Sequence, residues 1–401
     1  MAYDKSICVV GLGYIGLPTA SLLATKGFDV VGVDIDPEVV DTINKGNIHI
    51  VEPDLDILVK SAVNSGKLKA SMQPVEADVF IIAVPTPFKD EKEPNLAYVE
   101  AATKTICPLL KKGDLVILES TVPVGTTDDV VLATIALNRD DLVDEVNIAH
   151  CPERVLPGQI LRELIENDRV VGGVDERSTD AAVEFYESFV SGEVLATSAK
   201  TAEMAKLTEN AYRDVNIAFA NELSMICDEQ AINVWEMIRL ANRHPRVNIL
   251  NPGPGVGGHC IAVDPWFIVS SAPETAKLIR TARSVNDAKP NWVIDRISRY
   301  ADRFKDPVIG CLGLAFKADV DDLRESPALD IVQALNANAE WQVLVSEPNV
   351  DQMKEFDLLP YDEVIERSDI VVILVDHKKF RKIKASDLKE KVVIDTRGVV
   401  S

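Results

Sequence analysis

Three spaced glycines near the start of the chain constrain the fold more than any other feature of the sequence. Residues 6–10 are apolar and strand-like, residues 11–16 read GLGYIG, and a helical pattern continues through Leu23. In a dinucleotide-binding βαβ unit the first such glycine permits a tight turn, the second lets the backbone approach a pyrophosphate, and the third allows close packing of the helix. The chain is therefore predicted to begin with an α/β domain.

A second strand, residues 29–33, follows this helix and ends in Asp34, eighteen residues after Gly16. An acidic residue at this place can bind the 2′-hydroxyl of a ribose. Asp36 adds a second negative charge and no arginine adjoins it, so the 2′-phosphate of NADP would be repelled. We therefore expect the cofactor to be NAD.

The alternation of strands and helix-length segments continues with apolar runs at residues 79–84, 115–118, 147–149 and 169–174. This alternation predicts a doubly wound parallel sheet, in which ligands gather at the carboxyl ends of the strands. Residues 84–87 (VPTP) and 119–125 (ESTVPVG) lie at such ends. They are either ligand contacts or turns made rigid by proline and glycine.

A long helix is predicted from Thr201 to Ala231, where neither proline nor glycine occurs and apolar residues recur at helical spacing. A helix of about thirty residues is long for a globular protein and is typical of one that bridges domains or builds a dimer interface. Lys206, Asn210 and Arg213 share one face of it, because they are spaced four and three residues apart. That face is either part of a site or a polar stripe in water.

A second, smaller α/β lobe is predicted from apolar runs at residues 307–312, 342–345, 370–375 and 392–395. Its glycine turn, at Gly310 and Gly313, lacks the full G-x-G-x-x-G pattern, so a second NAD site is not expected. Lys317, Arg324 and Arg397 provide cations suited to a diphosphate, because guanidinium groups bind phosphate oxygens in pairs.

The stretch 251–267, NPGPGVGGHCIAVDPWF, places Cys260 in a glycine-rich turn and Asp264 four residues beyond it. A thiol on such a turn can be presented to a substrate, and the carboxylate can orient it or hold a water. Taken alone, the stretch favours a buried structural cysteine beside an ordinary loop, since free cysteine is among the most buried residue types and glycine loops are common.

Composition excludes several function classes. The 64 acidic and 42 basic residues give a formal net charge of −22, which disfavours an extended nucleic-acid surface. The start of the chain lacks the basic and apolar regions of a signal peptide, and no apolar run reaches the length of a membrane span, so we expect a cytoplasmic protein without a membrane partner. Six scattered cysteines without a C-x-x-C pair indicate neither disulfides nor a zinc site, and no metal is expected.

Several motifs in one order resemble the nucleotide-sugar 6-dehydrogenases, the family of the UDP-glucose and GDP-mannose dehydrogenases: GLGYIGLP, STVPVG, CPERVLPG, AKLTENAYRDVN, PGPGVGGHCIAVDPWF and LAFKADVDDLRESPA. The resemblance covers essentially the whole chain. It implies two Rossmann-like doubly wound lobes joined by a central long-helix region. An NAD-binding domain at residues 1–198, a helical, dimer-forming and catalytic region at 199–303 and a UDP-sugar-binding domain at 304–401 would form a homodimer or higher homo-oligomer, with the active site between the lobes.

The family reaction oxidises the primary alcohol at sugar C6 to a carboxylate and reduces two NAD. The resemblance makes Cys260 the nucleophile that forms a thiohemiacetal and then a thioester, with Lys206 and Asn210 stabilising the reacting oxygen and Asp264 assisting proton transfer. Two other interpretations remain open at this stage. One is a two-electron alcohol dehydrogenase in which Cys260 is structural, and the other is a catalytically silent protein that binds NAD and a nucleotide sugar.

The motifs and the resemblance together assign the contacts. Cofactor binding is assigned to Gly11, Gly13, Tyr14, Ile15, Gly16, Asp34, Thr86, Thr121 and Arg324. Substrate binding is assigned to Glu153, Arg154, Val155, Lys206, Asn210, Arg213, His244, Arg246, Gly257, Phe316, Lys317 and Arg397.

The sugar pocket departs from that of the glucose-type members. Pro157 stands where they have a second glutamate, and Arg154 stands where they have an aromatic residue. Arg154-Val155 with His244-Pro245-Arg246 resembles the branch that acts on UDP-N-acetylhexosamines, whose acetamido carbonyl accepts hydrogen bonds. The segments PGPGVGGHCIAVDPWF, RHPRVN and IHIVEPDL resemble the N-acetylmannosamine members, with UDP-N-acetylglucosamine as the alternative substrate. Surface polysaccharide or glycan synthesis is the implied purpose.

Overall fold

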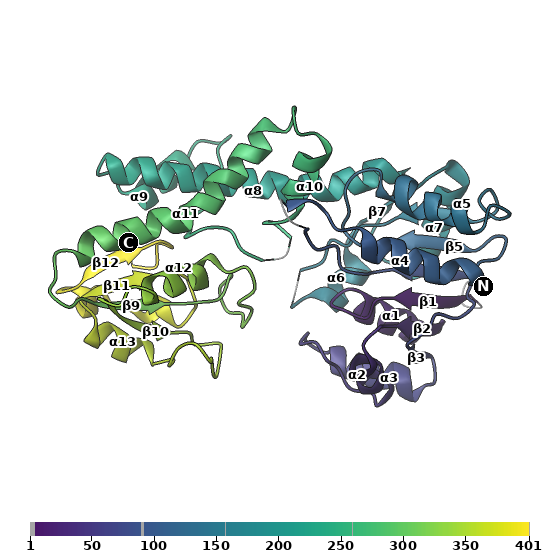
Figure 1. The fold of residues 1–401 in the computed structure, drawn as a ribbon, viewed down its shortest axis with the longest axis horizontal. Coiled ribbons are helices and arrows are strands. Elements are labelled where there is room, and N and C mark those ends of the chain that lie inside the picture. Colours follow the sequence, from purple (N-terminus) through teal and green to yellow (C-terminus); the bar gives the residue numbers. More distant parts are fainter. Residues whose placement is uncertain (1–4, 90–91, 157, 259, 401) are drawn as a thin grey trace. The chain divides into compact units, whose positions relative to one another are not determined.

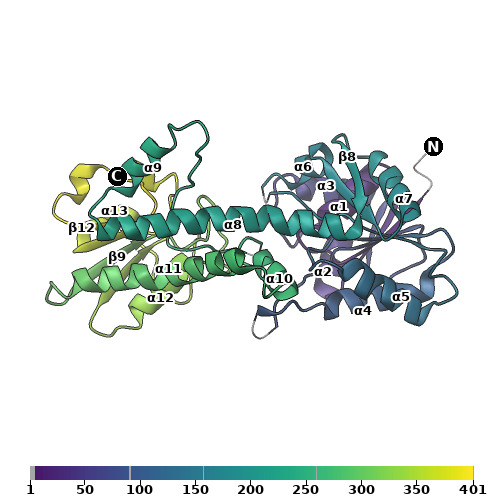
Figure 2. The same cartoon turned by 90° about the horizontal axis from the view of Figure 1, so that it is seen from above.

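The computed structural model describes residues 5–89, 92–156, 158–258 and 260–400. The chain divides into two compact units, Met1–Glu209 and Asn210–Ser401. The division falls inside α8 (Ala199–Glu229), which is a single helix of 31 residues (Figure 2). In the described ranges, no helix combines the length and the apolar character needed to cross a membrane.

The first unit is built on an eight-stranded sheet with the order β3-β2-β1-β4-β5-β6-β7-β8 (Figure 1). All neighbouring strands pair in parallel except β6 and β7. The strands are β1 (Ser6–Val10), β2 (Asp29–Val33), β3 (Leu68–Ser71), β4 (Val79–Ile82), β5 (Leu115–Leu118), β6 (Asn147–His150), β7 (Arg169–Gly173) and β8 (Val194–Ser198).

Helices cover both faces of this sheet because its central strands are apolar on both sides. One face packs against α1 (Gly16–Thr25), α2 (Pro37–Asn44), α3 (Leu55–Asn64), α6 (Ile160–Glu166) and α7 (Glu176–Glu187). The other face packs against α4 (Ala97–Ile106), the short η3 (Cys107–Leu109), and η4 (Thr127–Leu132), which leads into α5 (Ala133–Asn138). The predicted doubly wound arrangement is confirmed.

Two features of this sheet were not predicted. The edge strands β3 and β8 were missed because they are short and carry exposed polar residues, among them Lys69 and Ser198, which hide the apolar pattern. The expectation of a wholly parallel sheet is wrong at β7, which pairs antiparallel with β6 through Gly172 and Gly173. An apolar run indicates a strand but not its direction, so this reversal left no signal in the sequence.

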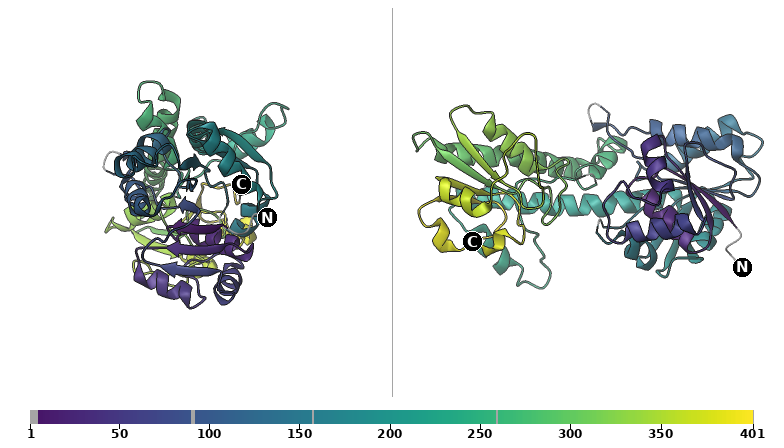
Figure 3. Two further views of the ribbon diagram at one scale, coloured as in Figure 1. Left: turned by 90° about the vertical axis from the view of Figure 1, so that its right-hand side faces the viewer. Right: turned by 90° about the horizontal axis from the view of Figure 1, so that it is seen from below.

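The second unit, whose C-terminal part is drawn in yellow in Figure 3, combines helices with a four-stranded parallel sheet. The order of its strands is β10-β9-β11-β12 (Figure 1). Its strands are β9 (Val308–Leu312), β10 (Gln342–Ser346), β11 (Ile370–Ile373) and β12 (Val392–Asp395). One face packs against α11 (Lys277–Ala301) and α12 (Pro327–Asn336), and the other against α13 (Tyr361–Arg367), η5 (Phe380–Lys382) and η6 (Ala385–Leu388). The remaining helices are α9 (Val234–Ala241) and α10 (Asp264–Ser271).

The predicted elements agree with the structure to within two residues at either end. Every predicted strand is present, and the helix predicted from Thr201 to Ala231 is α8. The cores of the two units are separate clusters of buried aliphatic side chains on the two sides of each sheet.

Candidate functional site

The glycine turn between β1 and α1 fits a bound pyrophosphate. Gly11 has a φ of +97°, and a Cβ atom there would lie 2.5 Å from the Ala83 carbonyl oxygen. A Cβ at Gly16 would lie 1.8 Å from the Gly11 carbonyl oxygen, whereas a Cβ at Gly13 would meet nothing within 4 Å. The fold therefore requires glycine at positions 11 and 16, whereas Gly13, the middle glycine of the motif, faces open space, as expected for NAD binding.

Asp34, just past the end of β2, lies beside this turn. Its Oδ2 accepts a hydrogen bond from the Leu12 N–H at 3.0 Å, and its Oδ1 accepts one from the Asp36 N–H at 3.0 Å. The carboxylate is half-buried, so part of it remains accessible to a ribose. Its two hydrogen bonds support the glycine turn.

The other predicted cofactor residues divide between the two units. Thr86 and Thr121, which follow β4 and β5, are joined by a 2.6 Å hydrogen bond from the Thr86 hydroxyl to the Thr121 carbonyl. Tyr14 is exposed and Ile15 is half-buried at the start of α1. Arg324, in contrast, belongs to the second unit, where it pairs with Asp322 at 2.6 Å.

Glu153 and Arg154 follow β6 in the first unit and have different surroundings. Glu153 is buried and pairs with Arg169, from its Oε2 to Nη1 at 3.1 Å. Arg154 is half-buried, pairs with Glu209 at 2.7 Å, and donates to the Asp168 carbonyl. Val155 packs against the core. Pro157, where a second glutamate was missing from the pattern, lies outside the described residues.

A buried polar cluster behind Glu153 was not predicted. It contains Glu119, Arg169 and Tyr186, and the Tyr186 hydroxyl donates to Glu119 Oε1 at 2.7 Å. Burial raises the pKa of the Glu119 carboxyl to about 7, although Arg169 opposes the shift. Glu119 follows β5, Arg169 begins β7 and Tyr186 lies near the end of α7, so the three residues are far apart in the sequence and no local pattern joins them.

Lys206, Asn210 and Arg213 lie on α8, as predicted. Lys206 and Asn210 are half-buried, whereas Arg213 is exposed. The Asn210 side-chain amide donates to the carboxylate of Asp264, the first residue of α10. Asp264 is buried, so this hydrogen bond satisfies an otherwise costly charge.

Cys260 belongs to the cysteine loop, defined as residues 251–258 and 260–263. Cys260 is exposed, whereas the other five cysteines are buried. Its carbonyl accepts the N–H groups of Val263 at 3.0 Å and Asp264 at 2.8 Å, so Cys260 begins the turn that leads into α10. The interpretation of Cys260 as a buried structural residue is therefore wrong.

The cysteine loop packs directly against the turn that follows β9. A Cβ at Gly257 would lie 2.2 Å from the Glu325 carbonyl oxygen and 3.0 Å from Phe316 Cβ. At Gly258, where φ is +84°, a Cβ would lie 2.9 Å from the Phe316 ring. The structure thus brings together Gly257 and Phe316, and the exposed Lys317 follows in the chain.

Arg397 lies beside the start of the same loop. Its Nη1 would be 2.6 Å from a Cβ at Gly253, and its Nε and Nη2 donate to Asp376 Oδ1 at 2.9 and 2.7 Å. A guanidinium held by a carboxylate keeps its orientation and can offer its remaining N–H groups to a phosphate. His244 and Arg246 are exposed after α9, with the Arg246 N–H 3.4 Å from His244 Nδ1.

The turn after β9 resembles the NAD turn in its backbone but differs in its acid. Gly313 also has a φ of +97°, and its N–H binds the Ser346 carbonyl as that of Gly11 binds Val33. Glu347 occupies the place of Asp34, but it is buried and accepts hydrogen bonds from Leu314, Ala315 and His377. An acid so engaged is not presented to a ribose.

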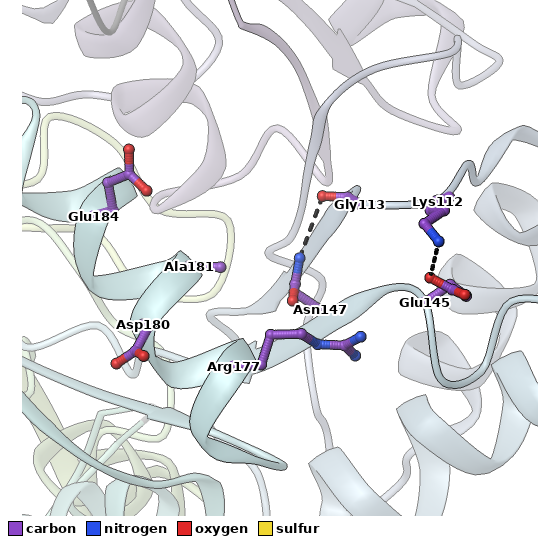
Figure 4. A pocket seen from close by; sticks show the side chains of 8 residues that line it. All are labelled: Lys112, Gly113, Glu145, Asn147, Arg177, Asp180, Ala181 and Glu184. Atoms are coloured by element: carbon purple, nitrogen blue, oxygen red, sulfur yellow. Dashed lines mark hydrogen bonds and ion pairs between the residues drawn. The ribbon is translucent and has the colours of Figure 1, made fainter.

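One pocket in the first unit is not a competing candidate for the active site. It measures about 410 Å³ and is lined by Lys112, Gly113, Glu145, Asn147, Arg177, Asp180, Ala181 and Glu184 (Figure 4). Lys112 pairs with Glu145 at 2.8 Å, and Arg177 donates to two main-chain carbonyls. Gly113 and Asn147 stand where β5 and β6 begin, opposite the strand ends at which ligands gather. In the described ranges, no group of three His, Cys, Asp or Glu side chains could hold a metal ion.

The sequence matches three consecutive domain descriptions of the UDP-glucose/GDP-mannose dehydrogenase family. They are its NAD-binding domain at residues 5–190, its central domain at 200–288 and its UDP-binding domain at 310–401.

Individual relatives are similar over almost their whole length. The chain is 59% identical to an NDP-N-acetyl-D-galactosaminuronic acid dehydrogenase from Ralstonia nicotianae, over 99% of this chain and 96% of that one. It is 57% identical to the UDP-N-acetyl-D-mannosamine dehydrogenase of Campylobacter jejuni, over 95% and 97%. The solved structure of the UDP-N-acetyl-mannosamine dehydrogenase from S. aureus matches with a TM-score of 0.89 and 44% identity, over 99% and 96%.

Proposed function

The chain belongs to the UDP-glucose/GDP-mannose dehydrogenase family, and from this premise we propose that it oxidises UDP-N-acetyl-D-mannosamine at C6 to UDP-N-acetyl-D-mannosaminuronate. The observation that carries the proposed chemistry is the exposed Cys260, which begins the turn anchored by the buried Asp264. Covalent catalysis requires a thiol that is accessible to substrate and held by a defined turn, whereas a cysteine that serves only to pack the core has no need to be exposed.

NAD, when bound, accepts a hydride from C6 at each of the two oxidation stages. Gly13 would lie against its pyrophosphate and Asp34 against its adenine ribose, with Thr86 and Thr121 at neighbouring strand ends. A carboxylate has about four acceptor sites, so Asp34 can accept hydrogen bonds from a ribose while it holds the Leu12 and Asp36 N–H groups.

Cys260 makes the second oxidation possible. Its thiolate adds to the C6 aldehyde and forms a C–S bond, and the former carbonyl oxygen becomes an alkoxide that takes up a proton. Loss of that proton and of the C6 hydride leaves a thioester, and water then breaks the C–S bond to release the carboxylate and the thiol. Lys206 and Asn210 would stabilise the negative oxygen, and Asp264 would take a proton from the water.

The acetamido sugar is supported by the names of the three relatives described above, which refer to N-acetylated hexosamines or their acids. Because Arg154 is oriented by Glu209 and Asp168, it is suited to hold an acetamido carbonyl. The 59% identity to a galactosaminuronic acid dehydrogenase favours a second candidate, an NDP-N-acetylgalactosamine substrate.

We expect the protein to act as a homodimer. Tyr212, Phe219 and Ile226 recur every seven residues along α8, and they are 71%, 52% and 46% exposed. An exposed apolar stripe with this period is suited to pack against the same stripe of a second copy.

Parallel assays test the proposal. UDP-N-acetyl-D-mannosamine, its gluco and galacto epimers and UDP-glucose would each be supplied with NAD, and kcat/KM would be compared. The manno epimer is expected to give the highest value. A higher kcat/KM for either other epimer would overturn the substrate assignment, and a Cys260→Ser variant that released uronate at the parent rate would overturn the covalent mechanism.

A further inference from the structure

Asn221, a fully buried residue of α8, makes the hydrogen bond that fixes the start of the cysteine loop. Its Oδ1 accepts the Gly253 N–H at 2.8 Å. Gly253 stands between Pro252 and Pro254, neither of which has an N–H group. The Gly253 N–H is therefore the sole main-chain donor of this three-residue segment, and the segment itself is buried.

The orientation of the Asn221 amide is set by Asn286 and, through it, by Asp214. Its Nδ2 donates to Asn286 Oδ1 on α11 at 2.9 Å. Asn286 Nδ2 in turn donates to the Asp214 main-chain carbonyl at 3.1 Å and to Asp214 Oδ1 at 2.8 Å. A carbonyl only accepts, so Asn286 must direct its NH₂ to Asp214 and its oxygen to Asn221. The Asn221 oxygen is then left facing Gly253.

This chain of hydrogen bonds is held in place by an ion pair. Arg283 Nη1 lies 2.6 Å from Asp214 Oδ1, and both side chains are almost completely buried. The fixed group therefore spans α8 and α11 and ends at the loop. At that end, Gly253 lies beside the Arg397 guanidinium, whose Nη1 would be 2.6 Å from a Cβ at this glycine.

We propose that Asn221 is a positioning residue for Cys260: it sets where the cysteine loop begins relative to Arg397, and Asn286 fixes the direction in which its amide points. The effect on turnover rests on the function proposed above, whereas the effect on the loop does not. Removal of the Asn221 amide leaves the Gly253 N–H buried without a partner, so the loop is expected to move until water reaches that group.

Thiol reactivity tests the proposal without substrate. Since Cys260 is exposed and the other cysteines are buried, the fast reaction of the folded protein with Ellman's reagent reports on Cys260. Asn221→Ala is expected to change this rate by about tenfold, because the loop that carries Cys260 moves when the buried Gly253 N–H loses its acceptor. The same variant is expected to lower kcat more than it raises the KM for NAD. Ser224→Ala is the matched control, since the Ser224 hydroxyl accepts from Lys289 and donates to the Asn221 main-chain carbonyl one turn along α8, whereas the Gly253 N–H bonds to the Asn221 side chain, which this variant retains.

Two further variants separate positioning from stability. Asn221→Asp retains an acceptor for Gly253 and loses the donor to Asn286, so its Cys260 reactivity should stay closer to the parent than that of Asn221→Ala, even where its Tm falls. Asn286→Ala keeps Asn221 but removes the acceptor that orients the Asn221 amide, so it should also change Cys260 reactivity. This variant replaces Asn221→Ala in the test if Asn221→Ala gives no soluble protein.

Parent-like Cys260 reactivity in Asn221→Ala and Asn286→Ala, with Tm values lowered as in Ser224→Ala, would overturn the proposal. If the parent protein oxidised none of the four nucleotide sugars, the proposed function would be contradicted. Altered Cys260 reactivity in Asn221→Ala and Asn286→Ala would still support the positioning of the loop.

Discussion

The Asn210 side-chain amide donates a hydrogen bond to the Asp264 carboxylate, and the Asp264 N–H binds the Cys260 carbonyl. Asp264 is only 3% exposed, and the Asn210 amide is one of the groups that hold its carboxylate. The proposed nucleophile, the proposed base and one proposed oxyanion ligand are thereby connected through two hydrogen bonds.

Asp264→Asn removes the negative charge of this side chain and keeps nearly the same shape. The amide oxygen can still accept from Asn210, so the Tm is expected to change by only a few degrees. Because the general base is lost, kcat should fall by about 10²- to 10⁴-fold. A variant that kept the parent kcat would exclude Asp264 from proton transfer, and circular dichroism before the assay would verify that it is folded.

Asp34 is expected to control the choice between NAD and NADP. Asp34→Ala is expected to raise the KM for NAD and to narrow the preference over NADP, because the ribose hydrogen bond and the repulsion of a 2′-phosphate are both removed. Asp34→Asn keeps an acceptor for the Leu12 N–H and serves as the control for the glycine turn. An unchanged ratio of kcat/KM values for the two cofactors in both variants would contradict this role.

Glu119 makes folding stability depend on pH. Its carboxyl pKa is raised by burial from 4.5 to about 7 in the folded state, so the folded protein holds a proton that the unfolded chain releases. Its contribution is fully present below about pH 4.5 and is lost as the pH rises toward 7, by up to about 1.4 kcal/mol per pH unit. Glu119→Gln keeps an acceptor for Tyr186 and should remove this slope.

Urea unfolding of the parent and of Glu119→Gln at several pH values measures the difference. The stability of the variant relative to the parent should increase between pH 5 and 7. A constant difference across this range would mean that Glu119 is ionised in the folded protein.

The apolar stripe of α8 is expected to form the proposed dimer interface. Phe219→Asp places a charge in the middle of the stripe of Tyr212, Phe219 and Ile226, and it should shift sedimentation from dimer to monomer. Leu137→Asp is the matched control, because Leu137 is an 86% exposed apolar residue of α5 and is not part of the stripe. A parent protein that sediments only as an active monomer would contradict the proposal.

Local features of the site could be predicted from the sequence because they depend on short-range chemistry. The glycine turn with Asp34, the helix carrying Lys206 and the Cys260 turn each have residue types and spacings with few structural alternatives. The reversal of β7 could not be predicted, since it depends on pairing with a strand chosen by the whole sheet. The same holds for Arg169 beside Glu153 and for Asn221 beside Gly253, whose partners are distant in sequence and are brought together by packing.

The yield of NADH per sugar consumed tests the central claim of a four-electron oxidation through Cys260 most directly. With excess NAD and a limiting, weighed amount of UDP-N-acetyl-D-mannosamine, the absorbance at completion is expected to correspond to two NADH per sugar, with the uronate as the product. One NADH per sugar, with the C6 aldehyde accumulating, would contradict it and would identify a two-electron alcohol dehydrogenase.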